Sequence, residues 1–163
     1  MQYNIMHSLH PERGEMNIEY QLQIDAIKGT RLHYREYENL IFICDGYIGV
    51  YLNERELKID KTKMIRIEAT AATNFNPENL LRERTAAIET KTARRLPGSG
   101  YAIKIYSKET GEHCYVDAKY LKMFKDYNSL FIKSKRDPVL IYRYGVPYGI
   151  ILPMNIPEQE GES

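Results

Sequence analysis

The chain has 163 residues, and its 23 Lys and Arg against 22 Asp and Glu give a formal net charge of +1. Hydrophobic residues make up 43% of the chain and charged residues 28%, which excludes a wholly disordered polar polypeptide. The same balance excludes a strongly basic or strongly acidic molecule, although it is compatible with a local basic face. At this length we expect one domain with a buried core.

The beginning of the chain and its two cysteines bear on the compartment. Residues 1–15 contain no apolar run of the kind found in a secretory signal. The longest clear apolar run, 40–44, is far too short to cross a bilayer. Without an export signal, reduced buried thiols at Cys44 and Cys114 are favoured over a disulfide. We therefore expect a cytoplasmic protein that does not enter a membrane.

The first half of the chain is expected to hold a strand, a helix and a β-hairpin. Residues 17–24 alternate apolar and polar side chains, a pattern typical of a strand. Asp25 is suited to cap a helix N-terminus, so we expect a helix over residues 25–38, weakened by Gly29. The other expected elements are a flexible arm at 1–16, a hairpin of strands 40–44 and 47–52 around Asp45–Gly46, and weaker strands at 57–59 and 64–69.

The second half opens with an ambiguous segment. Asn76 and Pro77 are suited to start a helix, so residues 77–100 are expected to form either a helix or a loop insertion that ends in Pro97–Gly100. Asp117 is expected to cap a helix over residues 118–127. The other expected elements are a hairpin of strands 101–106 and 112–116, three strands at 130–134, 139–142 and 148–152, and a disordered acidic tail at 158–163.

Two segments share a sequence pattern, which predicts an internal duplication. Ile24–Ala26 opens the first expected helix with the sequence Ile-Asp-Ala, and Val116–Ala118 opens the second with Val-Asp-Ala. Each copy is interpreted as a strand, a capped helix and a meander of strands. We therefore expect a single α+β domain over residues 17–157, with two helices packed on one side of an antiparallel sheet.

Basic side chains fall on the exposed side of both expected helices. At about 100° per residue, the Lys and Arg of the first helix lie in one sector, and those of the second lie opposite its apolar side. Such faces predict salt-dependent contact with the phosphate backbone of duplex DNA. The alternative interpretation is that charged faces serve solubility, and Asp126 dilutes the second face. The predicted DNA-binding residues are Lys28, Arg31, Arg35, Lys119, Lys122 and Lys125.

Three short segments resemble a known family. Ala118–Leu121 is similar to a helix start with the pattern N-x-K-Y-L, and Pro153–Met154 is similar to the Pro-Met pair of a final strand. Ile43–Val50 resembles a hairpin with the pattern A-T-D-G-H-R-L-A. In order and spacing these segments resemble one domain of the bacterial sliding clamp, the processivity ring (beta subunit) of DNA polymerase III.

The resemblance implies a DNA-clamp-like domain whose helices line a channel around duplex DNA, in a non-catalytic processivity or scaffold role in replication. It also implies a pocket for peptides of polymerases or other replication proteins. One domain cannot encircle DNA, so a ring would require homo-oligomer assembly through edge strands. The alternative is a monomeric protein-binding adaptor or clamp mimic. The implied peptide-binding residues are Asp45, Gly46, Tyr47, Pro153 and Met154, with Tyr47 in place of the family's His.

Enzymatic interpretations have weaker support in the sequence. Asp117–Lys119, with Asp45 at the end of another strand, would suit a magnesium-dependent nuclease, but a helix cap and a turn residue explain both carboxylates. A Cys–His nucleophile remains a further alternative. We therefore expect no enzyme, no cofactor and no metal. The potential zinc ligands His7, His10, His33, His113, Cys44 and Cys114 show no paired spacing.

Overall fold

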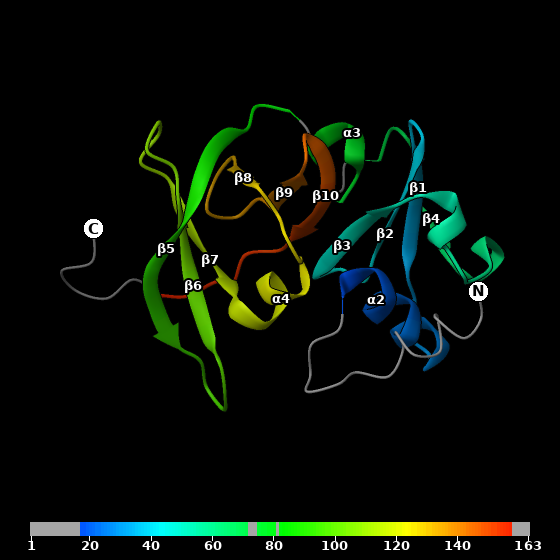
Figure 1. Ribbon diagram of the computed structural model, residues 1–163, viewed down its shortest axis with the longest axis horizontal. Helices are drawn as coiled ribbons and strands as arrows, with labels where there is room; N and C mark the ends of the chain where they lie inside the picture. The colour runs from blue at the N-terminus through cyan, green and yellow to red at the C-terminus, as the bar shows by residue number, and fades with distance from the viewer. Residues whose placement is uncertain (1–16, 72–74, 81, 158–163) are drawn as a thin grey trace.

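The computed structural model describes residues 17–71, 75–80 and 82–157 and has an α+β architecture (Figure 1). Its strands form one mostly antiparallel sheet in the order β4-β1-β2-β3-β10-β9-β8-β5-β6-β7, in which β4 runs parallel to β1. The expected arm at 1–16 and tail at 158–163 lie outside the described residues. The strands are β1 (His33–Tyr37), β2 (Leu40–Cys44), β3 (Ile48–Leu52), β4 (Ile65–Arg66), β5 (Thr85–Arg95), β6 (Tyr101–Tyr106), β7 (His113–Asp117), β8 (Ser129–Ile132), β9 (Val139–Arg143) and β10 (Val146–Ile151).

Three α-helices are described, and two of them pack on the same hydrophobic core. Helix α2 (Ile18–Ile27) buries Ile18 and Leu22, and α4 (Ala118–Met123) buries Leu121 in the same cluster. The short α3 (Pro77–Leu80) contributes Leu80 to a second cluster on the other face of the sheet. Two 3₁₀ turns, Glu54–Glu56 and Lys61–Lys63, connect β3 to β4. No helix in the described part of the chain is long and apolar enough to cross a membrane.

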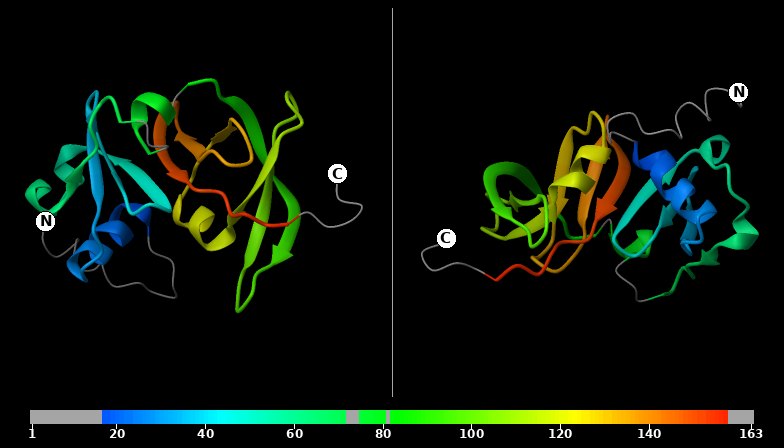
Figure 2. Two further views of the ribbon diagram at one scale, coloured as in Figure 1. Left: turned by 180° about the vertical axis from the view of Figure 1, so that it is seen from behind. Right: turned by 90° about the horizontal axis from the view of Figure 1, so that it is seen from below.

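The pairing of β3 with β10 joins the two halves of the chain. A meander of β1, β2 and β3 follows α2, and a meander of β8, β9 and β10 follows α4 (Figure 2). In the central pair, Val50 lies opposite Gly149 and Gly49 lies opposite Ile150. All of β3 and the last four residues of β10 are buried, and this pairing lies at the centre of the sheet.

Two glycines in this central pair leave room for two phenylalanine rings on opposite faces. A Cβ atom on Gly49 would lie 2.5 Å from the ring of Phe42, and one on Gly149 would lie 2.2 Å from the ring of Phe124. The Gly149 Cβ would also lie 2.4 Å from the main-chain oxygen of Gly49, which cannot turn away as a side chain can. The ring of Phe124 packs edge-on against Tyr148, with centroids 5.1 Å apart. The turn after α4 is therefore fixed directly on β10.

The expected strand at 17–24 and helix at 25–38 are both wrong. Apolar residues that alternate along a strand also stand four residues apart, and residues four apart lie on the same side of a helix. Ile18 and Leu22 are such a pair, and both are buried on one side of helix α2. The helix stops at Ile27 because Gly29 takes a left-handed conformation with φ +114°, and Thr30 N donates to Asp25 O across it. Asp25 therefore lies in the last turn of α2 and caps no N-terminus.

The expected duplication is correct for the helix and the meander that follows it, and wrong for the strand before the first helix and for the alignment of the two copies. A helix followed by a three-stranded meander occurs twice, but Asp25 lies near the end of α2 whereas Asp117 caps the start of α4. The strand expected at 17–24 in the first copy is part of α2 itself, so no strand precedes α2 within the described residues. The two Asp positions that defined the repeat in the sequence are thus not structurally equivalent.

The longest element in the segment at 77–100 is a strand. Helix α3 starts at Pro77, as the sequence suggested, but it ends at Leu80, and β5 then runs to Arg95.

Residues 57–59 form no strand, and only Ile65–Arg66 of the expected strand at 64–69 forms one. The helix expected at 118–127 ends at Met123. The two hairpins around Asp45–Gly46 and Thr110–Gly111 and the last three strands are confirmed within two residues at each end.

Replacing Gly149 by Ala should destabilise the fold by about 3 kcal/mol, since the new Cβ overpacks against a main-chain oxygen. Urea unfolding followed by circular dichroism measures the change. The exposed Ser99→Ala variant is the control and should unfold with the wild-type midpoint. A Gly149→Ala protein as stable as the wild type would contradict this account of the central pair.

Candidate nucleic-acid and peptide interfaces

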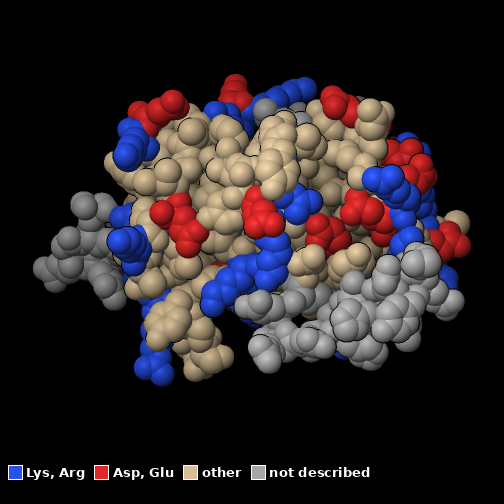
Figure 3. Space-filling view, in the orientation of Figure 1, with Lys and Arg blue, Asp and Glu red and all other residues tan. Residues whose placement is uncertain are grey.

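Three of the predicted DNA-binding residues lie together, on helix α4 and in the turn that follows it. Asp117 Oδ1 accepts a hydrogen bond from Lys119 N at 3.0 Å, which fixes the start of the helix. The Lys119 side chain is 66% exposed, and its Nζ lies 3.9 Å from Asp117 Oδ2. Lys122 is exposed, and Lys125 is half-buried in the turn that follows α4. We call Lys119, Lys122 and Lys125 the α4 cationic surface, and Figure 3 shows blue side chains over this part of the molecule.

The three predicted residues of the first half are not on one helix face. Lys28 is the C-cap of α2, and Arg31 is exposed in the loop that follows. Arg35 lies on β1, where its guanidinium donates to Ile67 O at 3.5 Å. The expectation of a second basic helix was wrong because α2 ends before these residues begin.

Arg143 connects the α4 turn to both α2 and β10. Its guanidinium lies 3.9 Å from the centroid of the Tyr148 ring, and it donates to the main-chain oxygen of Lys125 at 3.4 Å. It also forms an ion pair of 3.7 Å with Glu19, a side chain only 12% exposed on α2. Burial, and then the nearby Glu19 carboxylate, raise the pKa of Tyr148. Contacts with the side chain of Arg143 therefore help to hold the main chain that carries Lys125.

A second cationic element was missed in the sequence. Residues 90–104, which we call the β5–β6 ribbon, contain four Lys or Arg and no Asp or Glu. This part of β5 and β6 continues past α4 to a turn at the lower end of the molecule in Figure 1, where Figure 3 again shows blue side chains. Two signals could have found it: the Thr-rich, β-branched composition of residues 85–92 and the unbroken run of residues without a negative charge.

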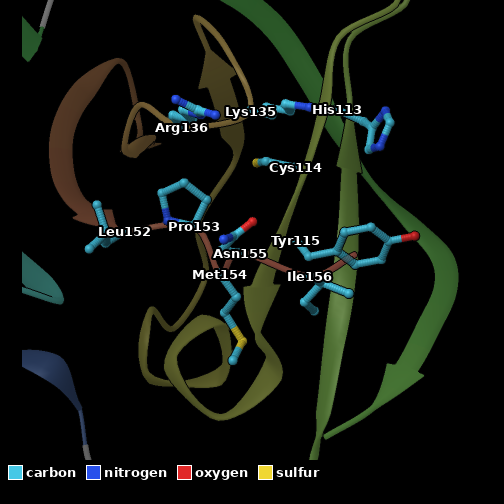
Figure 4. A pocket seen from close by; sticks show the side chains of 10 residues that line it. All are labelled: His113, Cys114, Tyr115, Lys135, Arg136, Leu152, Pro153, Met154, Asn155 and Ile156. Carbon is cyan, nitrogen blue, oxygen red and sulfur yellow. The ribbon is translucent and has the colours of Figure 1, made fainter. Parts of the chain in front are cut away.

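Pro153 and Met154 line a cleft of about 360 Å³ beside β7 (Figure 4). The segment after β10 runs antiparallel to β7 here, and Met154 N donates to Tyr115 O at 2.7 Å. Lys135 and Arg136 lie at one end of the cleft, on the loop between β8 and β9. The cleft therefore combines apolar walls with a cationic end, as a site for a short peptide would. Its other lining residues are His113, Cys114, Leu152, Asn155 and Ile156.

The remaining predicted peptide residues lie next to this cleft but do not line it. Tyr47 O accepts a hydrogen bond from Leu152 N at 2.7 Å, so the turn at 45–47 is adjacent to the segment that carries Pro153. Gly46 lines a different, largely apolar cavity of about 450 Å³ with Cys44 and Phe75. The side chain of Tyr47 is exposed. The fold thus brings the two predicted parts close together without forming one pocket from them.

Asp45 and Asp117, the carboxylates of the nuclease interpretation, both bind main-chain N–H groups. Asp45 Oδ1 accepts from Tyr47 N at 2.8 Å and from Ile48 N at 2.9 Å, and Asp117 accepts from Lys119 N. These bonds confirm their expected structural roles in a turn and a helix cap. Within residues 17–71, 75–80 and 82–157, no three His, Cys, Asp or Glu side chains come together as a set of metal ligands.

Comparisons with protein-family models, with curated proteins and with solved structures give no match to this chain. The resemblance to sliding clamps accordingly stays a prediction from the sequence.

Cys44 and Cys114 should resist modification in the folded protein. Both are buried and free of a disulfide, and burial raises the pKa of each thiol from 9.0 to about 12. At pH 8 both therefore stay protonated, and the thiolate is the reactive form. We expect dithionitrobenzoate to label both at least about 100-fold more slowly in buffer than in 8 M urea. Rapid labelling of Cys114 in buffer would contradict the expected protection and would favour the alternative of a Cys–His nucleophile.

Proposed function

We propose that this chain is a non-catalytic module that binds the phosphate backbone of duplex DNA, in a processivity or scaffold role like the one that the sliding-clamp resemblance implies. The observation that carries the proposal is the α4 cationic surface. Its lysines recur at every third residue, and α4 and its turn are held by the Asp117 cap, Leu121 and Phe124. Backbone contact needs a positive surface fixed in place and no base-specific side chains.

The two edge strands of the sheet are poorly suited to pair with a second copy of the chain. They therefore favour a single copy that contacts DNA from one side over a ring of several copies. At one end, β4 has only two residues. At the other end, β7 already accepts a hydrogen bond at Tyr115 from Met154 N. Short or covered edges are poor templates for pairing with a second chain. The proposal is therefore a clamp-like domain, supported by the repeated helix-and-meander order, that binds duplex DNA as a monomer and so favours the scaffold role over the processivity of a closed ring.

Removing the charges of the α4 cationic surface should weaken duplex binding and reduce its salt dependence. In the triple variant Lys119→Gln, Lys122→Gln, Lys125→Gln, the slope of log K against log salt should fall in magnitude by about 2 to 3, since each phosphate contact contributes about 0.9. Fluorescence anisotropy of a labelled 20-base-pair duplex measures both quantities between 25 and 200 mM salt.

The control for this series is Lys133→Gln, an exposed charge removal beyond the end of β8. It should bind as the wild type does. A wild-type chain without duplex affinity at 25 mM salt would overturn the proposal. That result would favour the alternative of a protein-binding adaptor that uses the cleft at Pro153 and Met154.

Light scattering of the purified chain should give the mass of one subunit, 19.1 kDa. The physical reason is the state of the two sheet edges, which offer little main chain for a second copy to pair with. A stable species several times heavier, at micromolar concentration and without DNA, would instead support the ring that the sliding-clamp resemblance implies.

A further inference from the structure

The β5–β6 ribbon is a cationic arm that ends in a turn closed by a main-chain hydrogen bond. Beyond its bulge, Arg95 pairs with Tyr101, and Leu96 N donates to Gly100 O at 3.0 Å to close the turn. Gly98 and Gly100 take left-handed conformations with φ +89° and +91°, which glycine adopts without strain. The tip is thus a tight turn defined by main-chain geometry.

A β-bulge directs the ribbon away from the main sheet. The pairing of β5 with β6 shifts register between Glu89 and Ala93, and such bulges bend a strand and increase its twist. Thr90 fixes the bulge because its hydroxyl donates to Lys104 O at 2.9 Å and accepts from Thr92 N at 3.1 Å. The first residues of β5 pair with β8, so the base of the ribbon is anchored in the sheet.

One of the four cations of the ribbon holds it to the rest of the fold. The Arg94 guanidinium lies 5.5 Å from the centroid of the Tyr115 ring and donates to Pro157 O. Lys104 is half-buried, whereas Lys91 and Arg95 are exposed. Lys91 and Arg95 are therefore the charges that the ribbon presents to solvent.

The ribbon and α4 form two walls of one concave corner. Ile103 lines a groove of about 320 Å³ together with Leu121 and Lys122 of α4. Alternate residues of a strand share a face, so Tyr101, and Arg95 opposite it, lie on the same face of the ribbon as Ile103. The Tyr101 side chain is 54% exposed on that face.

The groove of the corner is lined by two carboxylates, Glu89 and Asp126, as well as by two lysines. Glu89 accepts a hydrogen bond from the hydroxyl of Tyr127, and burial, followed by this hydrogen bond, raises the pKa of Tyr127. Asp126 belongs to the turn after α4, where it takes a left-handed conformation. Lys122 and Lys125 line the groove on the α4 side, and the ribbon side has no acidic residue from 90 to 104.

From this arrangement we infer that the β5–β6 ribbon is a second arm of the duplex DNA interface, with Lys91 and Arg95 contacting the phosphate backbone while the α4 cationic surface contacts it from the other wall. A two-stranded ribbon has the width that a DNA groove admits, and cations on two walls reach more phosphates than a single helix face. The inference rests on the proposed DNA-binding function and adds the element that makes the interface concave.

The test is the double variant Lys91→Gln, Arg95→Gln in the full chain, measured with the labelled 20-base-pair duplex in the salt series. We expect at least about a tenfold weaker affinity at 50 mM salt and a slope smaller in magnitude by about 2. The matched control Lys108→Gln, Lys133→Gln removes two exposed charges at other sites and should bind as the wild type does. Equal urea midpoints for all variants establish that folding is unchanged.

The outcomes separate the two claims. If the α4 triple variant loses affinity and the ribbon variant does not, the ribbon inference is overturned while the proposed function stands. If the ribbon variant and the matched control lose affinity equally, binding is a general effect of charge and the inference is again overturned. If the wild-type chain does not bind the duplex, the proposed function fails and the inference fails with it.

Discussion

The fold depends on how closely β3 and β10 approach each other and the rings packed on them. Glycine at 49 and 149 is what allows Phe42 to pack on one face of this pair and Phe124 on the other. Phe124 directly follows the C-terminus of α4, so its packing on β10 fixes the turn that carries Lys125, and the pairing of β10 with β3 joins the two meanders. The position of the α4 cationic surface is thus a consequence of packing at the centre of the sheet.

From this centre, the features that bear on function lie toward the second half of the chain. Arg143 links the turn after α4 to α2, which ties the first half of the chain to the α4 cationic surface. The bulge at Glu89–Ala93 then aims the β5–β6 ribbon past α4. A nearly neutral protein can present a cationic arm in this way, because residues 90–104 contain four Lys or Arg and no Asp or Glu.

The sequence predicted the parts of the fold that local chemistry determines. The Asp45–Gly46 turn, the Asp117 cap and the last three strands follow from turn residues, a capping carboxylate and short apolar runs. Helix α2 was misassigned because residues four apart share one side of a strand as well as one side of a helix. Gly29 ends this helix, whereas helix propensity alone treats a glycine only as a destabilising residue within a helix. Strand β5 was missed because Asn76 and Pro77 suggested a helix start and because its pairing with β8 is non-local, and with it the cationic β5–β6 ribbon was missed.

The central claim is that duplex DNA occupies the corner between α4 and the β5–β6 ribbon. Hydrogen–deuterium exchange of the full chain, with and without a saturating 20-base-pair duplex at low salt, tests it most directly. The account predicts that DNA slows exchange in residues 91–101 and 118–127 and leaves the loop at 28–32 unchanged. Slower exchange confined to the 28–32 loop or to the cleft at Pro153 and Met154, or no change anywhere, would contradict it.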